Sequence, residues 1–207
     1  MSAPPIAGTL TPRRHLIIRL VAAAMAAANI ADFTFGPLLG VNDHPPALAA
    51  AMLSSLRAAV TAGGLIALLY TGACGPGRMT RITQIVAIVG SALLVPAELL
   101  VHWSRAVAGP FYGLAVIGLL VGPLWYGTVA IRRGRWTGWR KWTPLLPAVA
   151  IAVFIVAMST GRGGAPAIGV FVLSYVPLAA ALFTQPGPGA DTGRNWGSAA
   201  GAHEVDN

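Results

Sequence analysis

Three ionisable residues lie inside long apolar stretches of this 207-residue chain: Asp32, Arg57 and Glu98. Placing one Arg, Lys or Asp in the middle of a membrane-spanning helix costs at least about 2.5 kcal/mol, and such residues are therefore rare. Those that occur usually pair with one another or serve a binding or catalytic role. We therefore take these three residues as the starting point for a candidate site.

The three residues are predicted to lie at one level of the bilayer. Asp32 and Glu98 each come sixteen residues after the expected start of a span, which places them about 24 Å along their helices. Arg57 lies in the intervening span, which runs the other way; it comes thirteen residues before Tyr70, which places it roughly 20 Å from the same boundary. Consecutive spans joined by short loops are expected to be neighbours. The spacing therefore predicts that the three side chains meet in the outer half of the membrane.

Two carboxyl groups beside one guanidinium suggest acid–base chemistry. Desolvation and like-charge repulsion would let one carboxyl keep its proton, as a general acid requires. In this interpretation Glu98 or Asp32 is the catalytic acid, and Arg57 holds the other carboxylate ionised. His102 follows Glu98 by four residues and would form a relay with it. The pocket would be completed by three more residues, namely Asn29, Arg105 and Tyr112.

A structural interpretation of the same residues stays open. Arg57 would then only neutralise Asp32 or Glu98 and clamp the helices, because many buried ion pairs do no more than fix packing. His102 and Arg105 would lie at the membrane interface, with their polar ends in water. They would extend a polar stripe, with Ser91 and Glu98, along one face of the third span.

The sequence contains no motif of the well-known hydrolase, metalloprotease or nucleotide-binding families. There is no G-x-S-x-G, H-E-x-x-H, phosphate-binding loop or dinucleotide motif. Cys74 is the single cysteine, so an internal disulfide and a multi-cysteine metal site are excluded, and we interpret this thiol as incidental. We predict no metal and no cofactor. Tyr175, in the middle of a span, requires a hydrogen-bond partner if it is buried.

Composition identifies the elements that must position these residues. Only 10% of the residues are charged and 56% are hydrophobic, with a mean hydropathy of +0.69. A soluble domain usually carries about 25% charged residues, so lipid is the natural solvent of this chain. We predict an all-α polytopic bundle in which spans of roughly 20 residues cross the membrane. The six predicted spans are Leu16 to Leu39, Leu48 to Thr71, Ile82 to Trp103, Phe111 to Ile131, Trp142 to Thr160 and Ala165 to Gln185.

Glycine and proline clusters, among them Gly109-Pro110, mark the expected loops. We predict a disordered N-terminus over residues 1–15, a transmembrane domain over 16–185 and a disordered tail over 186–207. Small-residue pairs such as Gly118-xxx-Gly122 are interpreted as packing contacts within the bundle.

Arginine placement predicts the orientation. Basic residues gather before the first span and in alternate loops, so both termini are expected in the cytoplasm and the chain in the plasma membrane. We attribute the formal charge of +8 to arginines that set the membrane orientation, and not to a surface that binds nucleic acid. An alternative remains, in which residues 13–28 form a cleaved signal segment and leave five spans.

Three functions fit these patterns. The first is a membrane-embedded enzyme of the cyclase or isomerase type, which protonates an apolar, lipid-like or isoprenoid substrate. The second is a non-catalytic membrane subunit, sensor or immunity protein, in which the buried charges serve packing. The third is a small proton-coupled permease. The lipid bilayer is the expected environment in each case, and the oligomeric state is left open.

Overall fold

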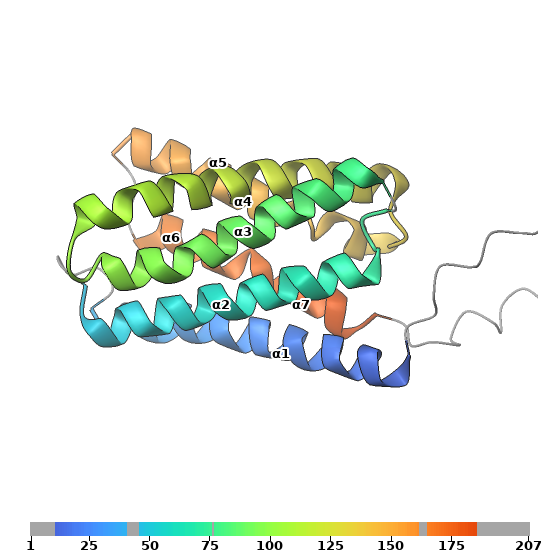
Figure 1. Cartoon of the computed structure of the whole chain (residues 1–207), viewed down its shortest axis with the longest axis horizontal. Coiled ribbons are helices and arrows are strands. Elements are labelled where there is room, and N and C mark those ends of the chain that lie inside the picture. Colours follow the sequence, from blue (N-terminus) through green and yellow to red (C-terminus); the bar gives the residue numbers. More distant parts are fainter. Residues whose placement is uncertain (1–10, 41–45, 76, 162–164, 186–207) are drawn as a thin grey trace, which may run out of the picture.

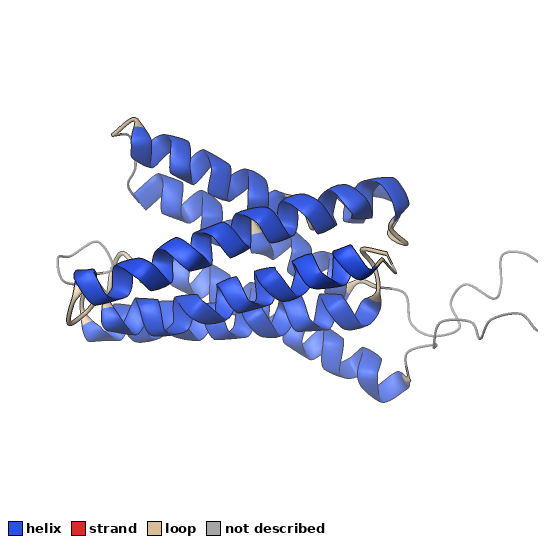
Figure 2. Ribbon diagram, turned by 45° about the horizontal axis from the view of Figure 1, so that its top comes forward, coloured by secondary structure: helices blue, strands red, loops and turns tan. Residues whose placement is uncertain are grey.

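The computed structural model describes residues 11–40, 46–75, 77–161 and 165–185. Of the predicted tails, 1–15 and 186–207, residues 1–10 and 186–207 lie outside the described residues, and the first helix already begins at Pro12. All the regular elements described are helical (Figure 2). In chain order they are α1 (Pro12–Phe35), α2 (Leu48–Thr71), α3 (Arg78–Leu100), α4 (Arg105–Arg133), the short 3-10 helix η1 (Gly138–Trp142), α5 (Leu146–Ser159), α6 (Ala165–Leu173) and α7 (Tyr175–Phe183).

The helices form an up-and-down bundle whose last members return to the first. Helices α1 to α4 run alternately along the long axis, α5 runs back beside α4, and α6 and α7 together make one further pass (Figure 1). Each helix packs on its predecessor, and α6 and α7 also pack on α1. Because α6 and α7 pack on α1, residues of α1 lie beside residues more than 130 positions later in the chain. For example, His15 Nε2 lies 3.0 Å from the carbonyl oxygen of Gln185.

Five helical segments are long and apolar enough to cross a membrane: α1, α2, α3, α4 and the combined segment Pro166–Phe183. Their outer faces carry large apolar side chains. Along α4, for instance, Leu114, Ile117 and Val121 are each about half exposed or more. A water-soluble protein rarely exposes so much contiguous apolar surface. The fold is therefore that of a helical protein whose surface suits lipid.

The fifth predicted span differs from the observed helix. Residues 138–142 form η1, and α5 covers only fourteen residues, from Leu146 to Ser159. At 1.5 Å per residue α5 is about 21 Å long, which is less than the roughly 30 Å of a hydrocarbon core. The sixth predicted span is present as two helices, because Pro177 has no N–H to bond the carbonyl oxygen of Leu173, and the helix is interrupted at Ser174.

The predicted loop at Gly109-Pro110 is wrong, because α4 already begins at Arg105. Ser104 caps this helix by accepting a hydrogen bond from the backbone N–H of Val107. The connection from α3 is thus the short turn that ends at Ser104. Pro110 lies inside α4, where membrane helices tolerate proline. Arg105 therefore belongs to α4 and does not extend the polar stripe of α3.

Glycines set the close contact between α3 and α4. A Cβ atom added at Gly118 would lie 2.9 Å from the carbonyl oxygen of Val86 and 3.1 Å from the Cα of Gly90. One added at Gly122 would lie 2.7 Å from the carbonyl oxygen of Thr83. Small residues allow membrane helices to approach this closely and gain van der Waals contact. The interpretation of Gly118-xxx-Gly122 as a contact within the bundle is confirmed.

Candidate functional site

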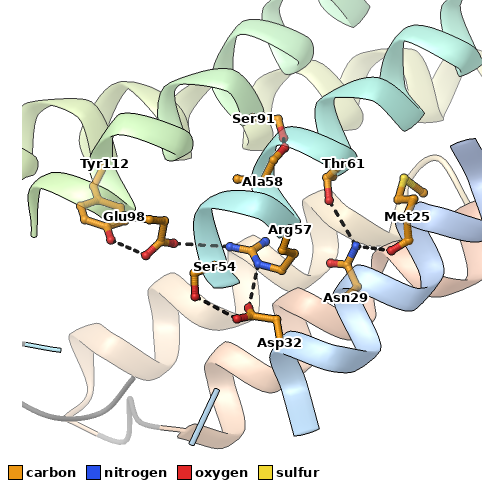
Figure 3. A network of polar contacts seen from close by, with 10 residues as sticks. All are labelled: Met25, Asn29, Asp32, Ser54, Arg57, Ala58, Thr61, Ser91, Glu98 and Tyr112. Carbon is orange, nitrogen blue, oxygen red and sulfur yellow. Dashed lines mark hydrogen bonds and ion pairs between the residues drawn. The ribbon is translucent and has the colours of Figure 1, made fainter. Parts of the chain in front are cut away.

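Asp32, Arg57 and Glu98 meet, as the sequence predicted. The Nε atom of Arg57 lies 2.8 Å from Oδ2 of Asp32, and its Nη2 lies 3.4 Å from Oε1 of Glu98 (Figure 3). The guanidinium of α2 thus links a carboxylate of α1 to a carboxylate of α3. Arg57 and Asp32 are both buried. Ion pairs of this kind need further hydrogen bonds to compensate the desolvation of both charges.

The two carboxyl groups have different surroundings. Asp32 is closely held, since Ser54 Oγ donates to its Oδ1 at 2.9 Å in addition to the ion pair. Glu98 has the longer contact with Arg57, and it accepts a hydrogen bond from the Tyr112 hydroxyl at 2.8 Å (Figure 3). Its side chain remains 17% exposed, against 7% for Asp32. Glu98 is therefore the more accessible of the two carboxyl groups.

A cavity of about 600 Å³ adjoins this network. Asp32, Arg57, Glu98 and Tyr112 all contribute to its wall. The rest of the wall is mostly apolar and comes from helices throughout the bundle; it includes Phe33, Leu94, Val116, Ile151, Phe154 and Phe171. The volume lies within the range of roughly 300–1,000 Å³ that is usual for small-molecule sites. Such a wall suits an apolar ligand, with the polar network to orient or act on one part of it.

Arg105 also lines this cavity. It is the exposed first residue of α4, near the end of the bundle where α1 and α3 finish. Pro37 and Pro46, on either side of the connection between α1 and α2 at the same end of the bundle, also line the cavity. The cavity therefore extends from the buried network toward this end of the bundle. In the predicted orientation this is the outer end.

His102 makes its hydrogen bond to the backbone before α2 and not to Glu98. Its Nδ1 lies 2.8 Å from the carbonyl oxygen of Pro46, and its ring makes an edge contact with Trp103 at 5.1 Å between centroids. The hydrogen-bond partners of Glu98 among the described residues are Arg57 and Tyr112. The predicted Glu98–His102 relay is thus not formed by direct contact. His102 instead ties the end of α3 to the residues that precede α2.

Asn29 takes part in the helix contacts beneath the ion pairs and does not line the cavity. Its Nδ2 donates to the carbonyl oxygen of Met25 at 2.8 Å and to Thr61 Oγ1 at 3.2 Å, so that it joins α1 to α2 (Figure 3). Ser91 similarly donates to the carbonyl oxygen of Ala58 at 3.0 Å and joins α3 to α2. These bonds hold the three charge-bearing helices in register.

Sequence reasoning missed the wall formed by α5 and α6. Phe171 of α6 lies under Arg57, with the guanidinium carbon 5.9 Å from the ring centroid. A cation over an aromatic face is attracted by the ring quadrupole. Ile151 and Val172 line the cavity beside it. These residues stand in uniformly apolar sequence, and nothing in that sequence marks them as site residues.

The described residues contain no cluster of three or more His, Cys, Asp or Glu side chains that could hold a metal ion. The acidic residues of the cavity wall are Asp32 and Glu98, and Arg57 lies between them. The arrangement can therefore exchange protons and form hydrogen bonds with a ligand.

Comparison of the chain with protein-family models, with curated proteins and with solved structures gives no match.

Proposed function

We propose that this chain is a six-span protein of the plasma membrane with both termini in the cytoplasm. Five segments are long and apolar enough to cross, and residues 138–159 would supply the remaining pass. Bilayers adapt to short apolar segments by thinning locally, at a modest cost for each ångström. The basic residues Arg14, Arg81, Arg132 and Arg140 belong to helix ends or turns on one side of this topology, as cytoplasmic residues do.

Within this topology, the best-supported activity is acid–base catalysis on an apolar, lipid-like small molecule such as an isoprenoid. One observation carries the proposal: a carboxyl group, Glu98, in the wall of a mostly apolar cavity of about 600 Å³. The site has two carboxyl groups and one guanidinium, so it is electrically neutral when one carboxyl carries a proton. Asp32 is closely held by Arg57 and Ser54, which leaves Glu98 to carry the exchangeable proton.

The reaction would need no redox partner. Glu98 donates its proton to a carbon–carbon double bond of the substrate, and the π electron pair forms the new C–H bond. The resulting cation closes a ring or shifts its charge, and it then loses a proton to the Glu98 carboxylate to form a new double bond. Arg57 and Tyr112 stabilise that carboxylate while the substrate is charged. The net reaction is an isomerisation or cyclisation of the substrate, and the protonated Glu98 is regenerated.

Deuterium exchange tests this activity even when the product is not identified. The protein is reconstituted in liposomes made in D2O that contain geranylgeraniol, a C20 isoprenoid alcohol, and deuterium in the extracted lipid is measured by mass spectrometry. The wild-type protein should incorporate deuterium, and Glu98→Gln should abolish incorporation. Thr128→Ala, at a half-buried position of α4 outside the cavity wall, is the matched control and should retain it. Equal incorporation by wild type and Glu98→Gln would remove the proposed role.

A non-catalytic subunit or sensor is the second candidate, because the polar groups also join helices to one another. Asp32–Arg57, Asn29–Thr61 and Ser91–Ala58 are all contacts between neighbouring helices. If packing is their whole purpose, Glu98→Gln changes only the thermal stability of the protein. A proton-coupled permease requires in addition a polar route to the other side of the membrane.

A further inference from the structure

A second group of polar side chains lies deeper in the bundle, away from the cavity wall. Tyr126 of α4 and Tyr175 at the start of α7 are both fully buried. Neither hydroxyl has a hydrogen-bond partner among the described residues. Gln84 of α3 is 3% exposed, and its Nε2 also lacks a partner among them. Each of these groups is a strong donor, and all three belong to the inner half of the bundle.

The three residues lie at similar depths. Tyr175 begins α7 and stands about 12 Å from its end at Phe183, taking 1.5 Å per residue. By the same rise, Tyr126 lies about 10 Å from the end of α4 and Gln84 about 9 Å from the start of α3. These helix ends all lie at the inner end of the bundle, where α7 finishes and α3 begins (Figure 1).

Contacts connect this group in both directions. Toward the cavity, Tyr175 makes an edge contact with Phe171 at 5.7 Å between centroids, and Phe171 lies under Arg57. Tyr126 and Gln84 lie on α4 and α3, which pack closely on each other. Toward the inner end, the polar side chain of Gln84 lies beside the Cys74 thiol. The three buried groups therefore belong to the part of the bundle between the ion-pair network and the turn that follows α2.

Leaving several buried donors without partners is unfavourable, and proteins usually satisfy such groups with ordered water. A buried water needs two to four polar partners, which the hydroxyls of Tyr126 and Tyr175 and the amide of Gln84 can supply. We infer that these residues bind a short file of internal water, which joins the Arg57–Glu98 network to the inner end of the bundle and carries protons between them.

Each step of this route transfers one proton and changes no oxidation state. A water molecule or tyrosine hydroxyl accepts a proton on its oxygen and releases another to its neighbour, so every group regains its composition. The inference deepens the proposed function, because it names the source of the proton on Glu98. It also supplies the polar route that a permease requires. The water file itself can be tested without any substrate.

Thermal stability separates a hydrated from a dry interior. Tyr126→Phe and Tyr175→Phe keep the ring and remove one hydroxyl. If water satisfies that hydroxyl, its removal costs a hydrogen bond, and the melting temperature in detergent should fall by about 2–4 °C. If the hydroxyl is dry and unpartnered, its removal should raise the melting temperature instead. Tyr70→Phe is the matched control, because Tyr70 is 72% exposed and should show no shift.

Proton flux tests the route. The protein is reconstituted in liposomes with an internal pH-sensitive dye, the potential is clamped with potassium and valinomycin, and an acid pulse is applied. Wild-type protein should accelerate internal acidification over protein-free liposomes, and Tyr126→Phe and Tyr175→Phe should each slow the protein-dependent rate about tenfold, as expected for one lost hydrogen bond. Tyr70→Phe should match the wild type.

The inference is overturned if both buried variants raise the melting temperature, or if their proton flux equals that of the wild type. The proposed enzyme fails by a different result, namely equal deuterium incorporation by wild type and Glu98→Gln. A protein that carries protons but leaves the isoprenoid unlabelled would therefore keep the water file and lose the catalytic role.

Discussion

The guanidinium of Arg57 and the carboxylate of Asp32 form an ion pair at 2.8 Å between α1 and α2, with both side chains more than nine-tenths buried. At the same level of the bundle the guanidinium also contacts Glu98 of α3. Two helices are thus tied to α2 through one side chain. This relationship makes Arg57 the residue on which the geometry of the site most depends.

Removing one partner of the pair should be more damaging than removing both. Arg57→Met leaves the buried Asp32 carboxylate without a cation and removes the contact with Glu98, and we expect a loss of roughly 3–5 kcal/mol in unfolding free energy. Asp32→Leu combined with Arg57→Met removes the close pair and should recover part of this loss. Unfolding of the reconstituted protein, followed by circular dichroism, gives both values. A double variant as unstable as the sum of the single variants would show that the two side chains are not coupled.

Tyr112→Phe should alter the function of Glu98 with little effect on folding. It removes one hydrogen bond, from the hydroxyl to Oε2 of Glu98, with an expected cost of about 1 kcal/mol. In the deuterium-exchange assay the variant should be slower than wild type at any substrate concentration, because the Glu98 carboxylate loses a donor when it forms. A Tyr112→Phe protein with wild-type exchange would place the hydroxyl outside the reaction.

Alanine substitutions at glycines of α4 should distinguish the face of this helix that packs on α3 from a face that meets no neighbouring atoms. Gly118→Ala and Gly122→Ala place a methyl group against the backbone of α3, and overpacking of this kind typically costs about 1–3 kcal/mol. Gly113→Ala, in the same helix, is the matched control, because a Cβ there would meet nothing within 4 Å. Melting temperatures of the three variants provide the measurement. Equal shifts at all three positions would contradict the α3–α4 contact.

Cys74 should resist thiol reagents in the folded protein. Burial raises the pKa of its thiol from 9.0 to about 12, while the neighbouring Gln84 side chain acts in the opposite direction. Only the thiolate reacts, and at pH 8 it would make up about one part in ten thousand. Alkylation by iodoacetamide, read by mass spectrometry, should therefore require unfolding. A cysteine introduced by Ser159→Cys, at an exposed position, should react in the folded protein.

The same raised pKa has a consequence for stability. The folded protein keeps the thiol proton to higher pH than the unfolded chain does, so the contribution of Cys74 to stability is complete below pH 9. It is lost as the pH rises from 9 toward 12, where the unfolded thiol is ionised and the folded one is not. Cys74→Ser should remove this part of the pH dependence. An unchanged alkaline profile in Cys74→Ser would indicate another titrating group.

The sequence by itself determined the helical class, the apolar character of the helix surfaces, and the common depth of Asp32, Arg57 and Glu98. The depth of a residue is its distance from the end of its own helix, and it follows from the residue count at 1.5 Å per residue. The alternation of short loops made the three helices neighbours. None of these inferences depends on how one helix is rotated against another.

Only the tertiary structure decided which faces meet. It turned His102 toward Pro46, assigned Arg105 to α4, and brought Phe171 under Arg57. It also buried Tyr126 and Tyr175, which are 49 residues apart, in the inner half of the bundle. Rotation and neighbour choice depend on where glycines permit close approach and where prolines interrupt a helix. Those effects arise between helices, and the pattern of any one helix does not contain them.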